Sequence, residues 1–303
     1  MKVSLTDKVI AITGGARGIG RATAVALAGE GARVAIGDLD LGVAKAAASA
    51  LDGEVLALEL DVTDRGSFER FLGAVERALG PIDVLVNNAG IQHVGAFASE
   101  DDAATARQVA VNLIGVMLGT KLALALMLPR RRGRIVNLAS AAGKVATPGG
   151  ATYCATKHAV VGLTESVREE IAGSGIEVTA VLPAIIDTEM ARGIAKARGV
   201  RAVPPEAVGR AIARAIARGT PSVYVPAYTG AINALLTALP RRPRTALRRL
   251  MRIDEILTQA DPFARAAYEA RAAASAPGRI EDRQSDALRG HEVKTTRTRE
   301  RNG

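Results

Sequence analysis

The chain has 303 residues, of which 48% are hydrophobic and 23% are charged. That much apolar side chain can offset the ordering entropy of a folded core, which excludes a wholly disordered chain. The length allows one large α/β domain or two small ones. A single cysteine and three scattered histidines exclude an internal disulfide and argue against a metal site, so we expect no metal ligands.

The formal net charge is +9, and most of the 40 cationic residues are arginine. Nucleic-acid binding is not expected, because four Tyr, four Phe and no Trp leave few side chains for base stacking. The N-terminus lacks a signal-peptide pattern, and the longest apolar run, residues 122–128, is far shorter than the roughly 20 residues of a membrane span. We therefore expect a cytoplasmic, non-spanning protein.

Up to residue 226, short β-branched runs alternate with segments of helical periodicity. This alternation is typical of repeated strand-helix-strand units around a parallel sheet. Between the strands, Phe68, Phe71, Leu72 and Val75 are spaced as one buried helical stripe and are predicted core residues. Seven strands are predicted, at residues 8–13, 33–38, 55–61, 82–86, 133–139, 176–182 and 222–226.

A glycine-rich loop, Thr-Gly-Gly-Ala-Arg-Gly-Ile-Gly, follows the first predicted strand and leads into a helix that begins near Gly18. Its glycines permit a tight turn, so that free N–H groups at the helix start can face a pyrophosphate. Gly14, Gly18, Ile19 and Gly20 are therefore candidate cofactor-binding residues. The fold class is α/β: a Rossmann-type doubly wound parallel sheet of about seven strands with helices on both faces.

The second predicted strand ends in Asp38, where a carboxylate can accept hydrogen bonds from the adenosine ribose hydroxyls. A carboxylate there repels the 2′-phosphate of NADP and accepts from the free 2′-hydroxyl of NAD. Arg17 in the loop favours NADP instead, because a guanidinium can pair with that phosphate. No basic residue directly follows Asp38, which favours NAD over NADP.

Three further motifs follow in order: Asn-Asn-Ala-Gly at residues 87–90, Ser140 after the fifth predicted strand, and Tyr-Cys-Ala-Thr-Lys at residues 153–157. The glycine loop is spaced more widely than the standard dinucleotide fingerprint. Together the motifs resemble the classical short-chain dehydrogenase/reductase family from about residue 7 to residue 226. The resemblance implies an NAD(P)-dependent oxidoreductase acting on an alcohol or ketone, and an oligomeric assembly.

The chemistry can also be argued from the residues. Moving a hydride to or from a carbinol carbon requires a group that takes or gives the proton on the oxygen. Tyr153 and Lys157 are four residues apart on a predicted helix and share one face. The ammonium, assisted by a positively charged nicotinamide ring, is expected to lower the tyrosine pKa from about 10. Tyr153 is thus the predicted general acid and base.

The resemblance assigns the other site residues. It makes Ser140 the hydroxyl that hydrogen-bonds the substrate oxygen, and Asn112 the helix residue that supports a water connecting Lys157 to solvent. Ala184 departs from the family, which usually has glycine there, and activity is expected to survive. The cofactor residues carried over by resemblance are Asp61 and Val62 at the adenine, Asn88, Ala89 and Gly90 at the adenosine ribose, Tyr153 and Lys157 at the nicotinamide end, and Pro183, Ile186 and Thr188 around the carboxamide.

Residues 190–203 are expected to form a mobile lid, and their apolar side chains indicate an apolar substrate such as a steroid, terpenoid or acyl chain. The predicted domains are a catalytic domain at 1–226, a helical extension at 227–276 and a disordered tail at 277–303. The extension is amphipathic and basic, so it either packs on the domain or touches an anionic membrane surface. By resemblance, a dimer or tetramer would form on the helices at 106–128 and 149–171.

Three functions remain open at this point. The first is an NAD-dependent dehydrogenase of a secondary alcohol or ketone. The second is an NADPH-dependent 3-ketoacyl-thioester reductase. The third is a nucleotide-sensing or membrane-associated scaffold without turnover, against which the complete set of Asn112, Ser140, Tyr153 and Lys157 argues.

Overall fold

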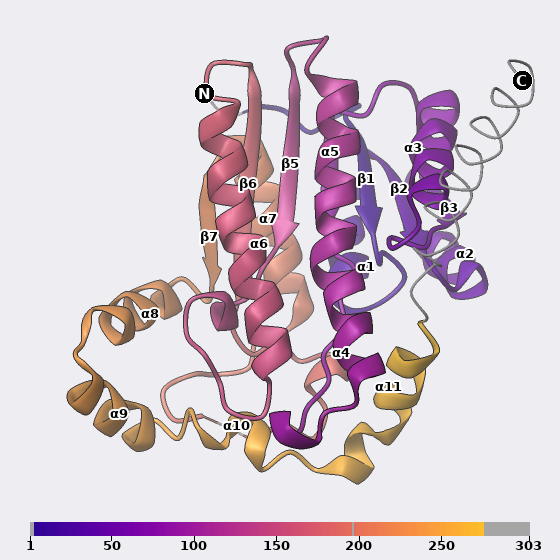
Figure 1. Ribbon diagram of the computed structural model, residues 1–303. Helices are drawn as coiled ribbons and strands as arrows, with labels where there is room; N and C mark the ends of the chain where they lie inside the picture. Colours follow the sequence, from indigo (N-terminus) through magenta and orange to yellow (C-terminus); the bar gives the residue numbers. More distant parts are fainter. Residues whose placement is uncertain (1–2, 196, 276–303) are drawn as a thin grey trace, which may run out of the picture.

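The structure is a computed structural model that describes residues 3–195 and 197–275; the tail at 277–303 lies outside the described residues. Seven parallel strands form one sheet in the order β3-β2-β1-β4-β5-β6-β7 (Figure 1). The predicted strands all form, and their ends differ from the prediction by at most two residues. Their bounds are β1 Val9–Thr13, β2 Arg33–Asp38, β3 Val55–Glu59, β4 Val84–Asn87, β5 Gly133–Leu138, β6 Ile176–Pro183 and β7 Ser222–Val225.

The strand order reverses beside β1, because β2 and β3 lie on one side of it and β4 to β7 on the other. Open α/β sheets bind ligands in the crevice outside the carboxyl ends of the strands at such a reversal. The predicted α/β fold class is confirmed, and the reversal places the ends of β1 and β4 at the expected cofactor site.

Helices cover both faces of the sheet. Side chains alternate along β1, so that Ile10 and Ile12 face one helical layer while Val9 and Ala11 face the other. The predicted stripe in the second layer, residues 68–75, is buried at all four of its apolar positions. The first layer consists of α1 (Gly18–Ala28), α2 (Leu41–Ser49) and α7 (Pro205–Arg218); the second consists of α3 (Arg65–Leu79), α5 (Gly115–Met127) and α6 (Ala151–Glu170).

A long helix runs from Asp102 to Met127 through α4 (Asp102–Val109), a π-helical turn at Ala110–Ile114 and α5. It is long and apolar enough to cross a membrane by length and composition. In the fold, however, Ala123 and Met127 are buried in the core beneath the sheet. The helix is therefore a layer of the α/β domain.

Helices α1 and α7 approach each other closely at Gly209, where a Cβ atom would lie 2.4 Å from the carbonyl oxygen of Ala22. We expect Gly209→Ala to lower the free energy of unfolding by about 1–3 kcal/mol, because the backbone of α1 would have to shift. Urea denaturation measures the change. Gly73→Ala is the matched control, since only the flexible guanidinium of Arg77 lies near that position, at 3.3 Å. Equal stability of the two variants would contradict the close packing.

Among the described residues beyond β7, up to residue 275, the chain forms four helices that run across the carboxyl ends of the strands (Figure 1). The predicted apolar face is only partly buried: Leu236 is buried, whereas Leu250 is 65% exposed. Arg248 turns inward, donates to the carbonyl of Ala146 at 2.7 Å and pairs with Asp254. The extension therefore packs on the domain. Its helices are α8 (Tyr228–Ala238), α9 (Arg241–Leu250), α10 (Glu255–Thr258) and α11 (Pro262–Ala274).

Candidate active site

The glycine loop has the backbone geometry that only glycine adopts easily. Gly14 and Gly18 have φ values of +62° and +48°. A Cβ atom on Gly20 would lie 2.1 Å from the carbonyl oxygen of Gly14. Helix α1 begins at Gly18, and no side chain caps its first N–H groups. These free donors at a helix N-terminus suit the diphosphate of a dinucleotide.

Asp38 lies at the end of β2, beside that loop. Its carboxylate accepts hydrogen bonds from the backbone N–H groups of Ala16 at 3.1 Å and Asp40 at 3.3 Å. Two backbone bonds fix the carboxylate and leave it further acceptor capacity. Arg17 pairs instead with Asp40, with Nη2 3.6 Å from Oδ2. The ion pair that would have offset the charge of Asp38 is therefore made elsewhere.

The Asn-Asn-Ala-Gly segment ties the ends of β1 and β4 together. Asn88 Nδ2 donates to the carbonyls of Thr13 and Gly14, both at 2.9 Å, and Thr13 Oγ1 accepts from the N–H groups of Asn88 and Ala89. A Cβ atom on Gly90 would lie 3.2 Å from Asn112 Oδ1, so a side chain there would crowd the site. Asp61 and Val62 line the same cavity from the end of β3.

The segment after β6 closes the cavity from the other side. Ile186 is buried, and Thr188 Oγ1 donates to its carbonyl at 3.4 Å. A Cβ atom on Gly18 would lie 3.4 Å from Thr188 Cγ2, which brings this segment against the glycine loop. Ala184, the predicted departure, donates its N–H to Val225 at 2.8 Å and has no left-handed φ, so its methyl group is accommodated.

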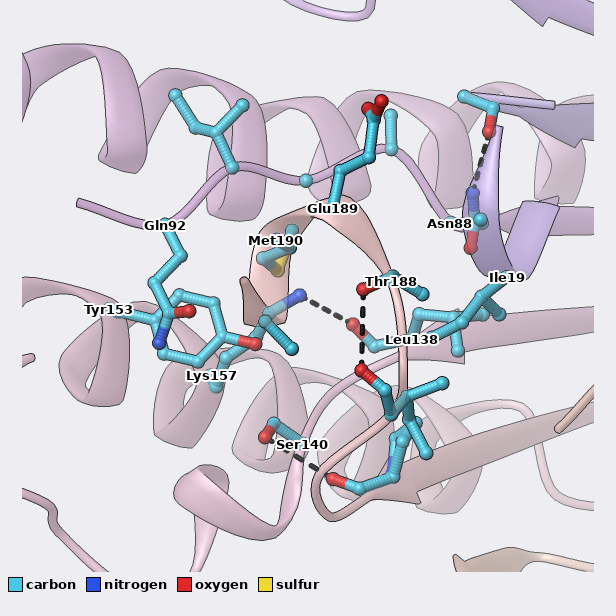
Figure 2. Close-up of a pocket in the computed structure, with 18 of the residues that line it drawn as sticks. Ile19, Asn88, Gln92, Leu138, Ser140, Tyr153, Lys157, Thr188, Glu189 and Met190 are labelled. Carbon is cyan, nitrogen blue, oxygen red and sulfur yellow. Dashed lines mark hydrogen bonds between the residues drawn. The ribbon is translucent and has the colours of Figure 1, made fainter. Parts of the chain in front are cut away.

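Ser140, Tyr153 and Lys157 converge on one part of the cavity (Figure 2). Ser140 lies just after β5; its hydroxyl accepts from the N–H of Ala142 at 3.1 Å and donates to the carbonyl of Pro183 at 3.4 Å. Tyr153 and Lys157 project from the same face of α6, as their spacing predicts. The three predicted side chains are thus brought together.

The pKa of Tyr153 corrects a prediction. Burial raises the pKa of this phenol to about 12, and its hydrogen bond with Ser140 offsets only part of that rise. Lys157 Nζ donates to the carbonyl of Leu138 at 2.8 Å and lies 5.7 Å from the tyrosine ring centroid, while burial lowers its own pKa to about 8. The predicted decrease was wrong for the protein's own groups, because it counted the nearby charge and left out the desolvation of both side chains.

Asn112 lies in the π-helical turn and is fully buried. Its side chain makes two bonds to the backbone of Ile91, accepting from the N–H and donating to the carbonyl, each at 2.8 Å. Nδ2 also lies 3.3 Å from Thr156 Oγ1. The side chain therefore holds the loop after β4 against α6; its predicted support of a water stays a prediction.

Sequence reasoning missed the residues on the substrate side. Gln92 is buried and lines the cavity, and Figure 2 draws it among the lining side chains. Tyr268 and Arg271 of α11 line the same cavity, as do Asn233 and Leu236 of α8. The Asp-Pro start of α11 could have revealed a helix, since Asp261 caps it, but no local pattern indicates where that helix packs.

These elements line one open cavity of about 1320 Å³. Every cofactor and catalytic residue predicted above lines it except Gly20, whose close approach braces the loop, and the buried Asn112. A family model for short chain dehydrogenases matches residues 8–199. The chain belongs to the short-chain dehydrogenase family. The family assignment, the predicted oxidoreductase activity on alcohols or ketones and the use of a nicotinamide cofactor are thereby confirmed.

This short-chain dehydrogenase is similar to two curated relatives and to one solved structure that differ in the activity or cofactor they are named for. The chain is 43% identical over 189 residues to 2-(S)-hydroxypropyl-CoM dehydrogenase 3 of Xanthobacter autotrophicus, covering 61% of this chain and 74% of that enzyme. It is 39% identical over 189 residues to the 3-oxoacyl-[acyl-carrier-protein] reductase FabG of Thermotoga maritima, covering 61% and 77%. A short chain dehydrogenase/reductase from Burkholderia phymatum, solved in complex with NAD, superposes with a TM-score of 0.72 at 26% identity, covering 81% of this chain and 96% of that one.

Proposed function

We propose that this short-chain dehydrogenase is NAD-dependent and transfers a hydride between nicotinamide and a secondary alcohol or ketone with an apolar body. The supporting observation is the single cavity that runs from Asp38 and the glycine loop to Ser140, Tyr153 and Lys157. A dinucleotide and its substrate can share that one cavity, next to the group that exchanges the proton.

Tyr153 is the proposed general acid in ketone reduction and the general base in alcohol oxidation. With a pKa of about 12, the phenol carries its proton at neutral pH, so the protein's own groups prepare it to protonate a ketone oxygen. Ser140 is proposed to hydrogen-bond that same oxygen, and the Lys157 ammonium to favour the phenolate once the proton has left. When bound, the nicotinamide ring supplies or accepts the hydride.

The choice of NAD over NADP rests on Asp38. Two backbone N–H groups orient its carboxylate beside the glycine loop. Among the described residues, no cation lies within 4.0 Å of it, since Arg17 pairs with Asp40. A 2′-phosphate placed there would meet an uncompensated negative charge, whereas a ribose hydroxyl can donate to it.

An apolar substrate is supported by the wall that the C-terminal extension adds to the cavity. Leu236, Ile253 and Leu257 are buried side chains of this wall, and Ile194 of the segment after β6 faces the same space. Burying a substrate's hydrocarbon against such a surface is favourable by about 25 cal/mol for each Å² removed from water. The relative named for oxidising a hydroxypropyl group supports a secondary alcohol as the reacting group.

The second candidate is an NADPH-dependent 3-ketoacyl-thioester reductase, which the likeness to the Thermotoga reductase favours. The uncompensated Asp38 carboxylate opposes it. A non-catalytic scaffold is opposed by the buried Tyr153 and Lys157, because burying an amine beside a phenol is unfavourable and serves no purpose in a scaffold.

A cytoplasmic homo-oligomer, a dimer or tetramer joined through the long helix and α6, stays part of the proposal. Contact with an anionic membrane also remains a proposal, now restricted to the exposed arginines of α9 such as Arg241 and Arg249. Arg248 is excluded from that role by its inward bonds.

Titration of the purified protein with NADH and NADPH, followed by nicotinamide fluorescence, tests the cofactor proposal. We expect NADH to bind at least about tenfold more tightly, and Asp38→Ala to remove most of that preference, because loss of the carboxylate removes both the ribose acceptor and the repulsion. Asp52→Ala, an exposed carboxylate outside the cavity, is the matched control. Tighter binding of NADPH by the unmodified protein would reject NAD in favour of the second candidate.

A further inference from the structure

Helix α11 lies beyond the carboxyl ends of the strands (Figure 1), and several of its residues line the cavity that Ser140, Tyr153 and Lys157 also line. Tyr268 of this helix is 9% exposed and lines the cavity. Its hydroxyl contacts the loop after β4 two residues beyond Gly90, where a Cβ atom would lie 3.6 Å from Lys157 Nζ. The cavity therefore holds a second phenol near the one that exchanges the proton. This phenol lies beyond the stretch that the family model matches, which ends at residue 199.

The hydrogen bonding of Tyr268 leaves one donor free. Its hydroxyl oxygen accepts from the backbone N–H of Gln92 at 2.8 Å. Within residues 3–195 and 197–275, the hydroxyl's own proton has no acceptor. Burial raises the pKa of this phenol, so the proton stays on the oxygen at neutral pH. A buried O–H group at a cavity wall, oriented by a backbone donor, is suited to bind an acceptor on a ligand.

Arg265 fixes this phenol in place. The guanidinium is 3% exposed and lies 5.2 Å from the Tyr268 ring centroid. Each of its N–H groups meets an acceptor: Nε and Nη2 bind Glu269, Nη2 also binds the carbonyl of Gln92, and Nη1 binds the carbonyls of Met190 and Arg192. One side chain thus joins α11 to the loop after β4 and to the segment after β6.

The segment after β6 is held by the extension at further points. The N–H of Asp261 donates to the carbonyl of Gly193 at 2.8 Å, and Arg271 pairs with Glu189. Ala195 donates its N–H to the carbonyl of Ile256 at 2.9 Å. The expected lid is therefore fastened to the extension, and the wall that carries Tyr268 is a built part of the site.

We propose that Tyr268 is a substrate-binding residue whose O–H group donates to a second oxygen of the substrate, close to the reacting carbinol. The preferred substrate class is then a secondary alcohol or ketone that carries a neighbouring hydroxyl, ether or carbonyl oxygen. This proposal rests on the proposed oxidoreductase function and adds a requirement to it. Arg265 acts through Tyr268 and is a positioning residue.

Three probes that share one apolar body test the proposal: α-methylbenzyl alcohol, which has a single oxygen, styrene glycol, and the glycol's ether methylated on the neighbouring oxygen. The ether can accept a hydrogen bond at the second oxygen but cannot donate one. The readout is the ratio of kcat/KM between each two-oxygen probe and α-methylbenzyl alcohol, measured by nicotinamide absorbance. In the unmodified protein we expect both ratios to be about ten or more.

Tyr268→Phe should bring both ratios to about one, since it removes the donor and keeps the ring. Arg265→Lys keeps the positive charge but loses the planar fork of donors, and should therefore lower both ratios. This second variant tests the proposal independently if Tyr268→Phe folds poorly. Phe263→Ala is the control on the same helix, because Phe263 is 89% exposed and should leave both ratios unchanged. Thermal unfolding checks that each variant is folded.

Ratios of about one in the unmodified protein, or ratios that survive Tyr268→Phe, would overturn the role of Tyr268 and leave the proposed function standing. A preference for the glycol but not for the ether would also overturn it, because the protein group would then be an acceptor. Failure of the unmodified protein to oxidise any probe, or reduce any matching ketone, would instead count against the proposed function.

Discussion

Replacing Tyr153 with Phe is expected to lower kcat by about 10²–10⁴-fold while leaving the dissociation constant of NADH within about twofold, because only the proton-exchanging hydroxyl is lost. The ring keeps its packing on α6, and the glycine loop and Asp38 are untouched. Steady-state oxidation of a secondary alcohol, followed by nicotinamide absorbance, measures the first quantity. Fluorescence titration with NADH measures the second.

Tyr224→Phe is the matched control, because Tyr224 is a half-buried strand residue that does not line the cavity. It should retain full kcat. Normal turnover by Tyr153→Phe would show that another group exchanges the proton. Loss of NADH binding along with turnover would instead show that the variant is damaged at the cofactor site, and Tyr153→Phe could then not define the acid.

Replacing Lys157 with Met is expected to lower kcat/KM by about 10²-fold or more, yet to change the free energy of unfolding by less than about 2 kcal/mol at pH 7. Burial lowers the pKa of Lys157 from its ordinary value of 10.5 to about 8. The charged amine is therefore unfavourable in the folded state by about 3 kcal/mol. Met relieves this penalty and forfeits the bond to Leu138, so the two changes partly cancel.

The pH dependence of unfolding separates these contributions. Between about pH 8 and 10.5 the unfolded chain holds a proton on Lys157 that the folded chain has lost, so the contribution of this group to stability increases with pH over that window. Below pH 8 the penalty is fully present. Urea denaturation from pH 7 to pH 10 should show this rise in the unmodified protein and in the surface control Lys144→Met, but not in Lys157→Met. A rise of equal size in all three would contradict the buried, partly neutral amine.

The phenol of Tyr153 acts in a different range. Its pKa is raised to about 12 from an ordinary value of 10, so its contribution to stability is fully present below pH 10 and is lost as the pH rises towards 12. The two buried groups therefore change stability in opposite directions, and their pH windows overlap only between about pH 10 and 10.5. Only the lysine window lies mostly in a pH range where the folded protein can be studied readily.

The sheet and the cofactor loop were predictable because their signals are local. Each strand is a short apolar run, and the stripe that contains Phe68 and Phe71 repeats with the period of a helix. Gly14 and Gly18 mark positive φ values that few other residues adopt easily. The position of Asp38 beside the loop was also predictable, because neighbouring parallel strands end at the same edge of the sheet.

The substrate side was not predictable from such signals. Gln92 and Tyr268 are 176 residues apart in the sequence and 2.8 Å apart in the structure, and nothing in the periodicity of either segment encodes that contact. The prediction that the pKa of Tyr153 is lowered failed for a related reason. A nearby charge can be read from the spacing of two residues, whereas the loss of water around them is known only after distant elements have packed.

The division of the cavity between two stretches of chain has a practical consequence. Residues up to β7 line the part of the cavity that we propose holds the dinucleotide and the proton donor, whereas α8, α10 and α11 line the wall that we propose contacts the substrate. On this proposal, libraries confined to wall positions such as Ile232, Leu236 and Ile256 are expected to change which alcohols are accepted while leaving the reaction itself unchanged. Replacing the whole extension with that of another protein would also remove Arg265, which bonds the carbonyls of Met190 and Arg192. The replacement extension would then need its own contact to hold the segment after β6.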